Sequence, residues 1–258
     1  MLPDVRKKRI LHEIQAHGSA QVTDLAELLG VSSMTVRRDL AELDEQGLIN
    51  RIHGGAEAST ATLEPAFAEK MGLNASEKNA IATAAATLAR AGQAISIAGG
   101  TTCLHIAQHI ADDTKLADLT IITNSLPVAD EFFARVSSHP RPARVLLTGG
   151  ERTPSDALVG PIAEASLTNL YADILFIGSH SATESGLLTP NLHEAQTNRA
   201  LIKNAHKVVT VFDGSKWNTA GLARYADWSD IDTVITTGEL PADALSFLDQ
   251  NVNEVLIA

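Results

Sequence analysis

The C-terminal part of the chain alternates between short apolar runs and longer stretches with helical patterning. Seven runs rich in β-branched residues occupy 94–98, 119–124, 144–150, 173–179, 207–213, 232–237 and 254–258. Each run is hydrophobic along nearly its whole length, as strands buried on both faces are. Because strands that alternate with helices form parallel sheets, the pattern predicts an α/β fold with a doubly wound, mainly parallel sheet.

The N-terminal residues follow a different pattern. Helical periodicity predicts three short helices, at 4–17, 23–30 and 32–45. Thr23 and Ser32 are the expected N-caps of the second and third. The segment "LINRIHGG" (48–55) then alternates apolar and polar residues and ends on two glycines, as a short hairpin does. Three helices followed by a hairpin predict a winged helix-turn-helix, a DNA-binding module.

The third predicted helix carries an arginine pair on its open face. Val36, Leu40 and Leu43 share the inner face, which leaves Met34 and the Arg37–Arg38 pair outside. Arginines at this place can bond guanine or grip phosphate. They could instead be solvated charges paired with an acid one turn along the helix, but the following wing favours DNA contact. The predicted DNA-binding residues are Ser33, Thr35, Arg37, Arg38, Arg51, His53 and Gly54.

The change of pattern divides the chain into three parts. We expect a winged helix-turn-helix domain at 1–57, a linker at 58–75 and an α/β domain at 76–258. The net charge is −11, yet residues 1–55 hold seven Lys and Arg against eight Asp and Glu. The acidity therefore belongs to the α/β domain, and a local basic face on the first domain remains possible.

The expected cellular compartment is inferred from features that the sequence lacks. Cys103 is the one cysteine, so an intramolecular disulfide is excluded and a reducing compartment is expected. The basic N-terminus is not followed by the apolar segment of a signal peptide, and no stretch approaches the ~20 apolar residues that span a bilayer. We therefore expect a cytoplasmic protein without a membrane partner.

Small and polar residues follow five of the predicted strands. The segments are "AGGTT" (98–102), "TNS" (123–125), "TGG" (148–150), "GSHSATESG" (178–186) and "DGSK" (213–216). Ligands of such sheets bind at the carboxyl ends of the strands, where glycines let backbone N–H groups approach a phosphate. Each segment alone could be a plain turn, but all five at one sheet edge favour a small anionic ligand.

The chain resembles the DeoR family of bacterial transcription regulators along nearly its whole length. Residues 5–56, with "VTDLAELLGVSSMTVRRDLAELDEQGLI" and "RIHGGA", are similar to the family's DNA-binding domain. Residues 76–258 are similar to its sensor domain, which resembles ribose-phosphate isomerases in fold and commonly binds a phosphorylated sugar. The resemblance implies a repressor of sugar uptake or catabolism genes, released from double-stranded operator DNA by that effector. It also implies a homodimer or homotetramer, and neither a cofactor nor a resident metal.

The strand-end segments supply the predicted effector site, and the family's landmarks match several of its residues. The predicted effector-binding residues are Gly99, Gly100, Thr101, Thr102, Asn124, Ser125, Gly150, Glu184, Asp213 and Lys216. One position departs from the family, whose loop often begins with Asp where this chain has Ala98. That departure keeps open a regulator whose sensor answers to a protein partner.

Two chemical alternatives use the same part of the chain. Lys216 and Asp213, with Glu184, His180 and His193, could supply acid–base groups for sugar-phosphate isomerisation. We expect a binding site and no catalytic residues, because the attached DNA-binding module gives the pocket another use and Ala98 cannot assist a base. His105 and His109 share a helix face next to Cys103, but no further metal ligand is evident, so helix-surface histidines are expected.

Overall fold

The computed structural model describes residues 6–7, 9–11, 13–14, 19–45, 49–52, 54–58 and 67–258. The chain divides into two compact units, Met1–Pro65 and Ala66–Ala258. Across the described ranges, no helix is both long and apolar enough to cross a membrane.

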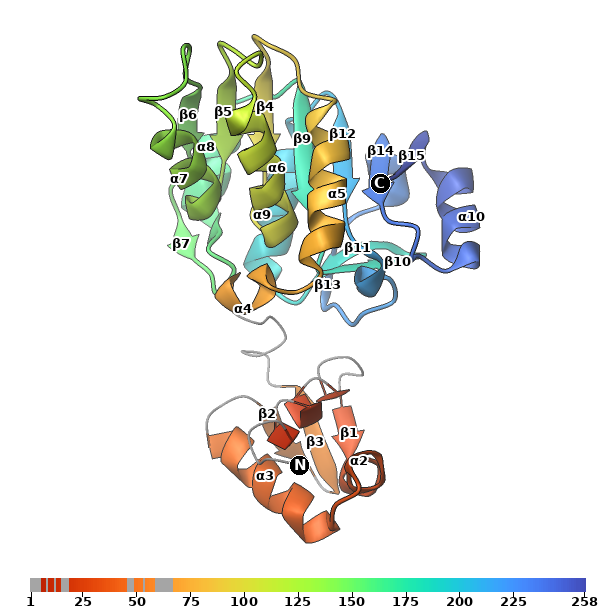
Figure 1. Ribbon diagram of the computed structural model, residues 1–258. Coiled ribbons are helices and arrows are strands. Elements are labelled where there is room, and N and C mark those ends of the chain that lie inside the picture. The colour runs from red at the N-terminus through yellow and green to blue at the C-terminus, as the bar shows by residue number, and fades with distance from the viewer. Residues whose placement is uncertain are drawn as a thin grey trace. The chain divides into compact units, whose positions relative to one another are not determined.

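The first unit is a winged helix-turn-helix, as predicted (Figure 1). Residues 6–7, 9–11 and 13–14 are helical, and α2 (Val22–Leu29) and α3 (Ser33–Glu45) follow. A small antiparallel sheet has the order β1-β3-β2, formed by β1 (Ser19–Gln21), β2 (Ile49–Ile52) and β3 (Gly55–Ala58). The core of the unit is Ile10, Ile14, Val22, Leu25, Leu29, Val36, Leu40, Leu43, Ile49 and Ala56.

The start of the second helix differs from the prediction. The N-cap of α2 is Gln21, an extended residue whose side chain makes no capping bond, and Thr23 lies inside the first turn. The strand β1 runs directly into this helix, and the Val22 N–H, one of the helix amides with no partner inside the helix, donates to the backbone carbonyl of Gly54 at 2.9 Å. The Ser32 cap is confirmed, because its Oγ accepts from the Thr35 N–H at 3.1 Å.

All seven predicted strands form one parallel sheet in the second unit. They are β4 (Ala94–Ile97), β5 (Thr120–Thr123), β6 (Arg144–Leu147), β9 (Ile174–Gly178), β12 (Val208–Val211), β14 (Thr233–Thr236) and β15 (Glu254–Ile257). The order is β15-β14-β12-β9-β4-β5-β6. The chain builds outward from β4 to β6 and then returns to place β9 on the other side of β4, so the topological switch point lies between β4 and β9.

Helices cover both faces of this sheet (Figure 1). The first core cluster joins one face to α5 (Ala75–Ala86), α6 (Thr101–Asp112) and α7 (Leu126–Ala134). The second joins the other face to α8 (Pro161–Leu167), α9 (Leu192–Lys203) and α10 (Ala242–Asn251). Alternate residues of one strand serve different cores, with Phe176 in the first and Ile177 in the second. This is why the strands read as continuous apolar runs.

Short elements beyond the sheet were not predicted. A three-stranded antiparallel sheet has the order β10-β11-β13, from β10 (Ser181–Thr183), β11 (Gly186–Thr189) and β13 (Ala223–Ala226). A two-stranded ribbon joins β7 (Glu151–Arg152) and β8 (Leu158–Val159), and two 3-10 turns are η1 (Gly214–Lys216) and η2 (Trp228–Asp230). The helix α4 (Phe67–Met71) forms within the range expected to be an irregular linker, where the Phe67 N–H donates to the Pro154 carbonyl at 3.1 Å.

Candidate functional site

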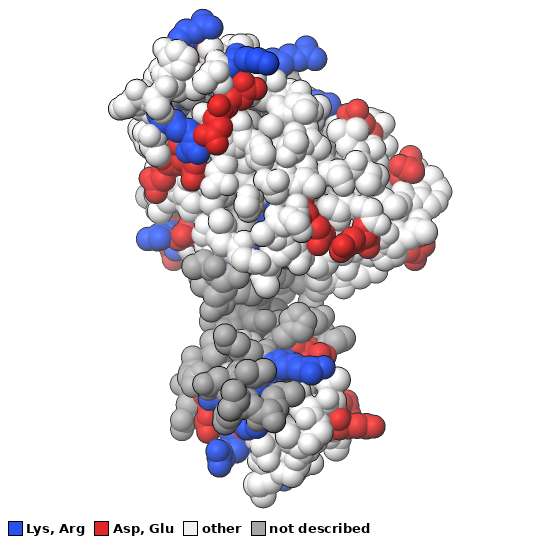
Figure 2. All heavy atoms as spheres, in the orientation of Figure 1, with Lys and Arg blue, Asp and Glu red and all other residues white. Residues whose placement is uncertain are grey.

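The open face of α3 carries an exposed apolar and basic surface. Val36 and Leu40 are buried, whereas Ser33, Met34, Arg37 and Arg38 are exposed. Met34, Thr35, Arg37 and Arg38 line one shallow hollow. Lys and Arg atoms and Asp and Glu atoms are both visible on this unit in Figure 2, in keeping with its small net charge. The arginine pair therefore lies on the side of α3 turned away from the core.

The two arginines differ in their partners. The Arg38 Nε lies 3.6 Å from the Glu42 carboxylate one turn along α3, and both side chains are solvent-accessible. Such an exposed pair is worth little and opens readily. Glu42 also accepts from the Lys7 Nζ at 3.1 Å, so it is shared. Arg37 makes no ion pair with any residue that the structure describes, so its guanidinium is available to a polyanion.

A buried ion pair holds α3 in place, and sequence reasoning missed it. Asp39 is 2% exposed and accepts from Arg6 through both oxygens, at 2.5 Å from Nε and 3.0 Å from Nη2. The hydrogen bond with Asp39 raises the pKa of the Arg6 guanidinium, so the pair stays charged. The available signal was a carboxylate at an inner-face position between Val36 and Leu40.

The remaining predicted DNA-binding residues lie at the ends of these elements. Arg51 is exposed on β2, and its N–H donates to Asp44 at 3.2 Å. Gly54 is exposed in the turn of the wing. Thr35 is half-buried, and its hydroxyl bonds the Ser32 hydroxyl at 2.9 Å, which ties it to the start of α3. His53 lies outside the described residues.

The glycine–threonine loop lies at the switch point of the large sheet. It follows the carboxyl end of β4, next to that of β9, and leads into α6. The N-cap Gly100 has φ +124 and no side chain, and no side chain of the described residues caps the first amides of α6. A helix start of this kind binds anions through its N–H groups. Thr101 and Thr102 are buried in the first turn.

Of three other predicted residues, Asn124 contacts the loop directly, and Ser125 and Gly150 follow the neighbouring strands. The Asn124 side chain accepts from the Gly99 N–H at 3.2 Å and donates to the Leu158 carbonyl at 3.1 Å. Ser125 is the N-cap of α7. Gly150 has φ +132 and no room for a side chain, because a Cβ would lie 2.5 Å from the Val159 carbonyl oxygen. In the structure, these residues therefore contact neighbouring parts of the protein.

Asp213 and Lys216 lie at the two ends of one 3-10 turn. Asp213 is buried and accepts through Oδ1 from the Asn74 amide and the Ser215 N–H, each at 3.0 Å. Its Oδ2 is also buried and has no hydrogen-bond partner among the described residues. Within that part of the chain no ion pair joins Lys216 to Asp213, although the Lys216 N–H donates to the Asp213 carbonyl at 3.0 Å.

Two lysines near this turn were missed by sequence reasoning. Lys78, on α5, is 3% exposed, and its ammonium group donates to the Lys70 carbonyl at 2.7 Å. The Lys70 ammonium donates to the Ser155 hydroxyl at 3.1 Å. Burial lowers the pKa of Lys78, and the positive charges of Lys216 and Lys70 lower it further, against the opposing effect of Asp213. Lys70 and Lys216 are therefore close enough to Lys78 for their charges to act on it, and the signal in the sequence was a lysine in the apolar stripe of α5.

Two glutamates of the region differ in their burial. Glu184 lies exposed in the turn between β10 and β11. Besides Asp213, Glu194 in the first turn of α9 is a buried carboxylate, and it accepts from the Thr153 hydroxyl at 2.9 Å and the Thr189 hydroxyl at 3.1 Å. His193 is exposed, and His180 is half-buried.

The histidine and cysteine side chains of α6 have separate environments. His109 bonds the Asn79 side chain at 2.9 Å. Burial lowers the pKa of His105, and the charges of Lys78 and His109 add to this effect. The Cys103 sulfur lies 3.8 Å from the Phe176 carbonyl, and burial raises the pKa of its thiol to about 12. No group of three or more metal-ligating side chains occurs in the described ranges.

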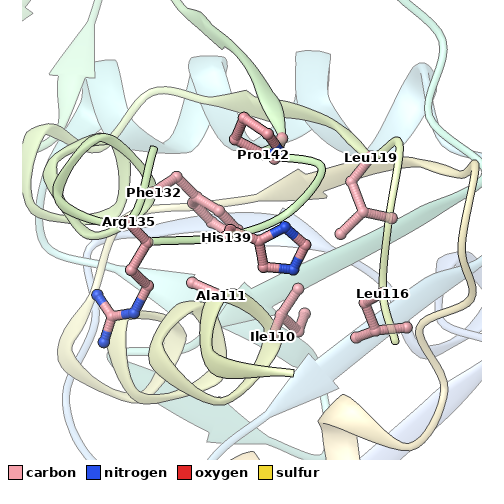
Figure 3. Close-up of a pocket in the computed structure, with 9 residues that line it drawn as sticks. Ile110, Ala111, Leu116, Leu119, Phe132, Arg135, His139 and Pro142 are labelled. Carbon is pink, nitrogen blue, oxygen red and sulfur yellow. The ribbon is translucent and has the colours of Figure 1, made fainter. Parts of the chain in front are cut away.

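A small cavity lies at the opposite edge of the sheet from the carboxyl ends of the strands (Figure 3). It is bounded by the C-terminal end of α6, by α7 and by the residues that precede β5 and β6, and it holds about 10 Å³. That is room for one water molecule. Phe132 and Leu119 line it with other apolar groups, and the Arg135 side chain is paired with Asp112 at 2.5 Å. This cavity is a packing gap, so the strand-end residues remain the candidate ligand site.

Two family models match the chain. Residues 6–62 match the DeoR-like helix-turn-helix domain, and residues 73–238 match the DeoR C terminal sensor domain. Together the matched ranges cover most of the chain.

Similar proteins match nearly from end to end. The HTH-type transcriptional regulator GlpR of Haloferax volcanii is 37% identical over 247 residues, which cover 95% of this chain and 93% of that protein. The HTH-type transcriptional repressor CsqR of Escherichia coli K12 is 33% identical over 98% of this chain and 94% of its own length. The lactose phosphotransferase system repressor of Staphylococcus epidermidis is 32% identical, with 90% of each chain covered.

Solved structures show a more distant likeness. Ribose 5-phosphate isomerase A of Methanocaldococcus jannaschii superposes with a TM-score of 0.40 at 17% identity, over 56% of this chain and 55% of that one.

Proposed function

This chain belongs to the DeoR family of transcriptional regulators, and we propose that it represses genes of sugar uptake or catabolism and leaves its operator when a phosphorylated sugar binds. The observation that carries the effector class is the buried Lys78 side chain, whose pKa is lowered by burial and further by the positive charges of Lys216 and Lys70. A regulator of this kind acts in the cytoplasm, where its operator lies.

The positive charges of Lys70, Lys78 and Lys216 favour a ligand that carries a phosphate group. A buried ammonium group whose pKa is lowered by two neighbouring lysines gains from a bound dianion, because the dianion offsets both the burial and the repulsion. The amides at the start of α6 add hydrogen-bond donors that carry no proton to lose. Gly99, Gly100, Thr101 and Thr102 form this part of the proposed effector site.

The sugar hydroxyls need acceptors, and Asp213 supplies one. Its buried Oδ2 has no hydrogen-bond partner in the described part of the chain, and such an atom is costly unless a ligand or water satisfies it. We propose that Asp213 accepts a hydrogen bond from a sugar hydroxyl. Lys216 would bind the phosphate or a sugar oxygen next to it. No catalysis is proposed, since Oδ1 is already held by Asn74 and Ser215, and the loop begins with the apolar Ala98.

The route from effector to DNA begins with α4. This helix starts two residues after the boundary between the units, and Lys78 bonds its last turn through the Lys70 carbonyl. Asn74, between α4 and α5, bonds Asp213. A phosphate that draws the Lys78 ammonium group away would release α4, and a sugar on Asp213 would move Asn74. Both changes would alter the segment that leads to the winged helix-turn-helix.

The DNA-bound form is a dimer or a larger homo-oligomer in this proposal. One winged module buries little surface, so sharp specificity calls for two modules on half-sites about 34 Å apart. Ser33, Thr35, Arg37, Arg38, Arg51, His53 and Gly54 are the proposed contacts to that DNA.

Fluorescence anisotropy on DNA from upstream of the protein's own gene tests the proposal. At fixed salt, sugar phosphates and the same sugars without phosphate are titrated into the complex. We expect one phosphorylated compound to release the DNA and its unphosphorylated form to leave the complex intact.

Release by the unphosphorylated sugars would contradict the effector class. Binding that no compound disturbs, together with release by a protein partner, would favour a sensor that answers to proteins. Turnover of a sugar phosphate would favour an isomerase.

A further inference from the structure

We propose that Met34 reads the C5-methyl group of a thymine in each operator half-site. This inference rests on the proposed function, because it concerns the same contact between α3 and DNA. Its basis is an exposed apolar side chain at a position where the neighbouring side chains are basic.

Met34 has no structural role that explains its side chain. It is 71% exposed, the largest exposed fraction among the large apolar side chains that the structure describes. The core of the winged helix-turn-helix is complete without it. An exposed methionine is a flexible apolar group that loses contact with water when a partner covers it.

The position of Met34 indicates which partner covers it. Met34 is the second residue of α3, and in helix-turn-helix modules the N-terminal residues of the recognition helix contact base edges. Arg37 and Arg38 follow at three and four residues, so they share its face, and all three line one hollow. A partner that covers this face must therefore offer negative charge beside an apolar group.

The major groove of DNA meets both requirements. Its phosphates flank the groove, and the thymine methyl is the apolar group on its base edges. The backbone under Met34 is well held, because Ser32 accepts from the Thr35 N–H through Oγ at 3.1 Å and from the Val36 N–H through its carbonyl at 3.1 Å. The side chain can adjust to the methyl while its Cα stays in register with the arginines.

The experiment replaces thymine by uracil, which removes the methyl and keeps every hydrogen-bonding group of the base. A duplex is first selected from random sequences by the full-length protein. Each thymine of that duplex is then replaced in turn, and the Kd is measured by anisotropy. For the wild type we expect about a fourfold loss at one position per half-site, the effect of one buried methyl. Met34→Ala should bind the parent duplex more weakly and lose this uracil sensitivity, whereas Met34→Leu should keep it.

Leu28→Ala is the matched control, since Leu28 is an exposed apolar residue of α2 and should leave the uracil profile unchanged. An unchanged uracil penalty in Met34→Ala would overturn the inference, as would a wild type that tolerates uracil at every position. Either result, with specific binding intact, leaves the proposed function standing. Failure of the wild type to select any duplex would overturn both.

Discussion

The Lys78 side chain is buried in the fold, and we expect its substitution to separate sensing from DNA binding. Lys78→Met keeps the length and apolar stem of the side chain but removes the ammonium group. We expect the variant to bind the operator as the wild type does and to need at least about tenfold more sugar phosphate for release, the loss of one charge-assisted contact. Anisotropy at fixed salt measures both. Lys115→Met, at an exposed lysine, is the control. If the sugar phosphate releases Lys78→Met from the operator as readily as the wild type, Lys78 is not part of the effector site.

The same residue predicts a pH dependence of stability. The pKa of Lys78 is lower in the folded protein than its ordinary value of 10.5, mainly because of burial. Between the two values the unfolded chain binds more protons, so the stability of the wild type rises with pH in that window; below the folded pKa the cost of the buried charge is present in full. Without ligand, Lys78→Met should therefore be more stable than the wild type at neutral pH, and the difference should shrink toward about pH 10.

Urea unfolding of both proteins at the two pH values measures this difference, with Lys115→Met as reference. If the difference in unfolding free energy between the two proteins is the same at both pH values, the pKa of Lys78 does not differ between the folded and unfolded states. A wild type that is the more stable at neutral pH would mean that the Lys78–Lys70 hydrogen bond outweighs the burial.

At the scale of elements, α3 depends on the buried pair of Asp39 with Arg6. Asp39→Asn keeps the shape and removes the charge, leaving the arginine without its counter-ion. We expect the thermal midpoint of the first unit to fall by several degrees and operator binding to weaken, while the second unit melts as before. Differential scanning calorimetry resolves the two transitions. Asp24→Asn, at an exposed carboxylate on α2, should change neither. A first transition that is unmoved in Asp39→Asn would contradict this account of the pair.

The helix α4 is expected to couple the two functions. Phe67 is buried at the start of α4, and Phe67→Ala removes its ring contacts without removing an ammonium group. The variant should bind the sugar phosphate within a few-fold of the wild-type affinity by calorimetry and bind the operator normally, yet release it poorly. Loss of effector binding itself would instead make α4 part of the site, and normal release would exclude α4 from the route.

The same elements show how far the sequence could predict the fold. The seven sheet strands were predicted because residues such as Phe176 and Ile177 are both buried, on opposite faces, and leave an unbroken apolar run. The strands β10, β11 and β13 are only three or four residues long, so their pairing depends on tertiary contacts that no local pattern records. The glycine–threonine loop was predicted from its position after the first apolar run and from the resemblance to the DeoR family. Lys70 and Lys78 were missed because only the folded chain brings α4 and α5 to the edge of the sheet.

At the scale of the whole molecule, the two units carry different charges and different tasks. Most of the net charge of −11 belongs to residues beyond 55. The DNA contacts therefore depend on a few local arginines and lysines, so the affinity should fall only modestly with salt. What the account requires is that ligand and DNA oppose each other through the folded chain, and linkage makes this opposition reciprocal.

The most direct test is a calorimetric measurement of one affinity in two states. The Kd of the releasing sugar phosphate is measured for the free protein and for the protein saturated with operator. The account predicts weaker binding to the complex, by the same factor as the sugar phosphate weakens operator binding, on the order of tenfold or more. Equal affinity in the two states would contradict it, because a ligand that binds both states equally cannot release the DNA.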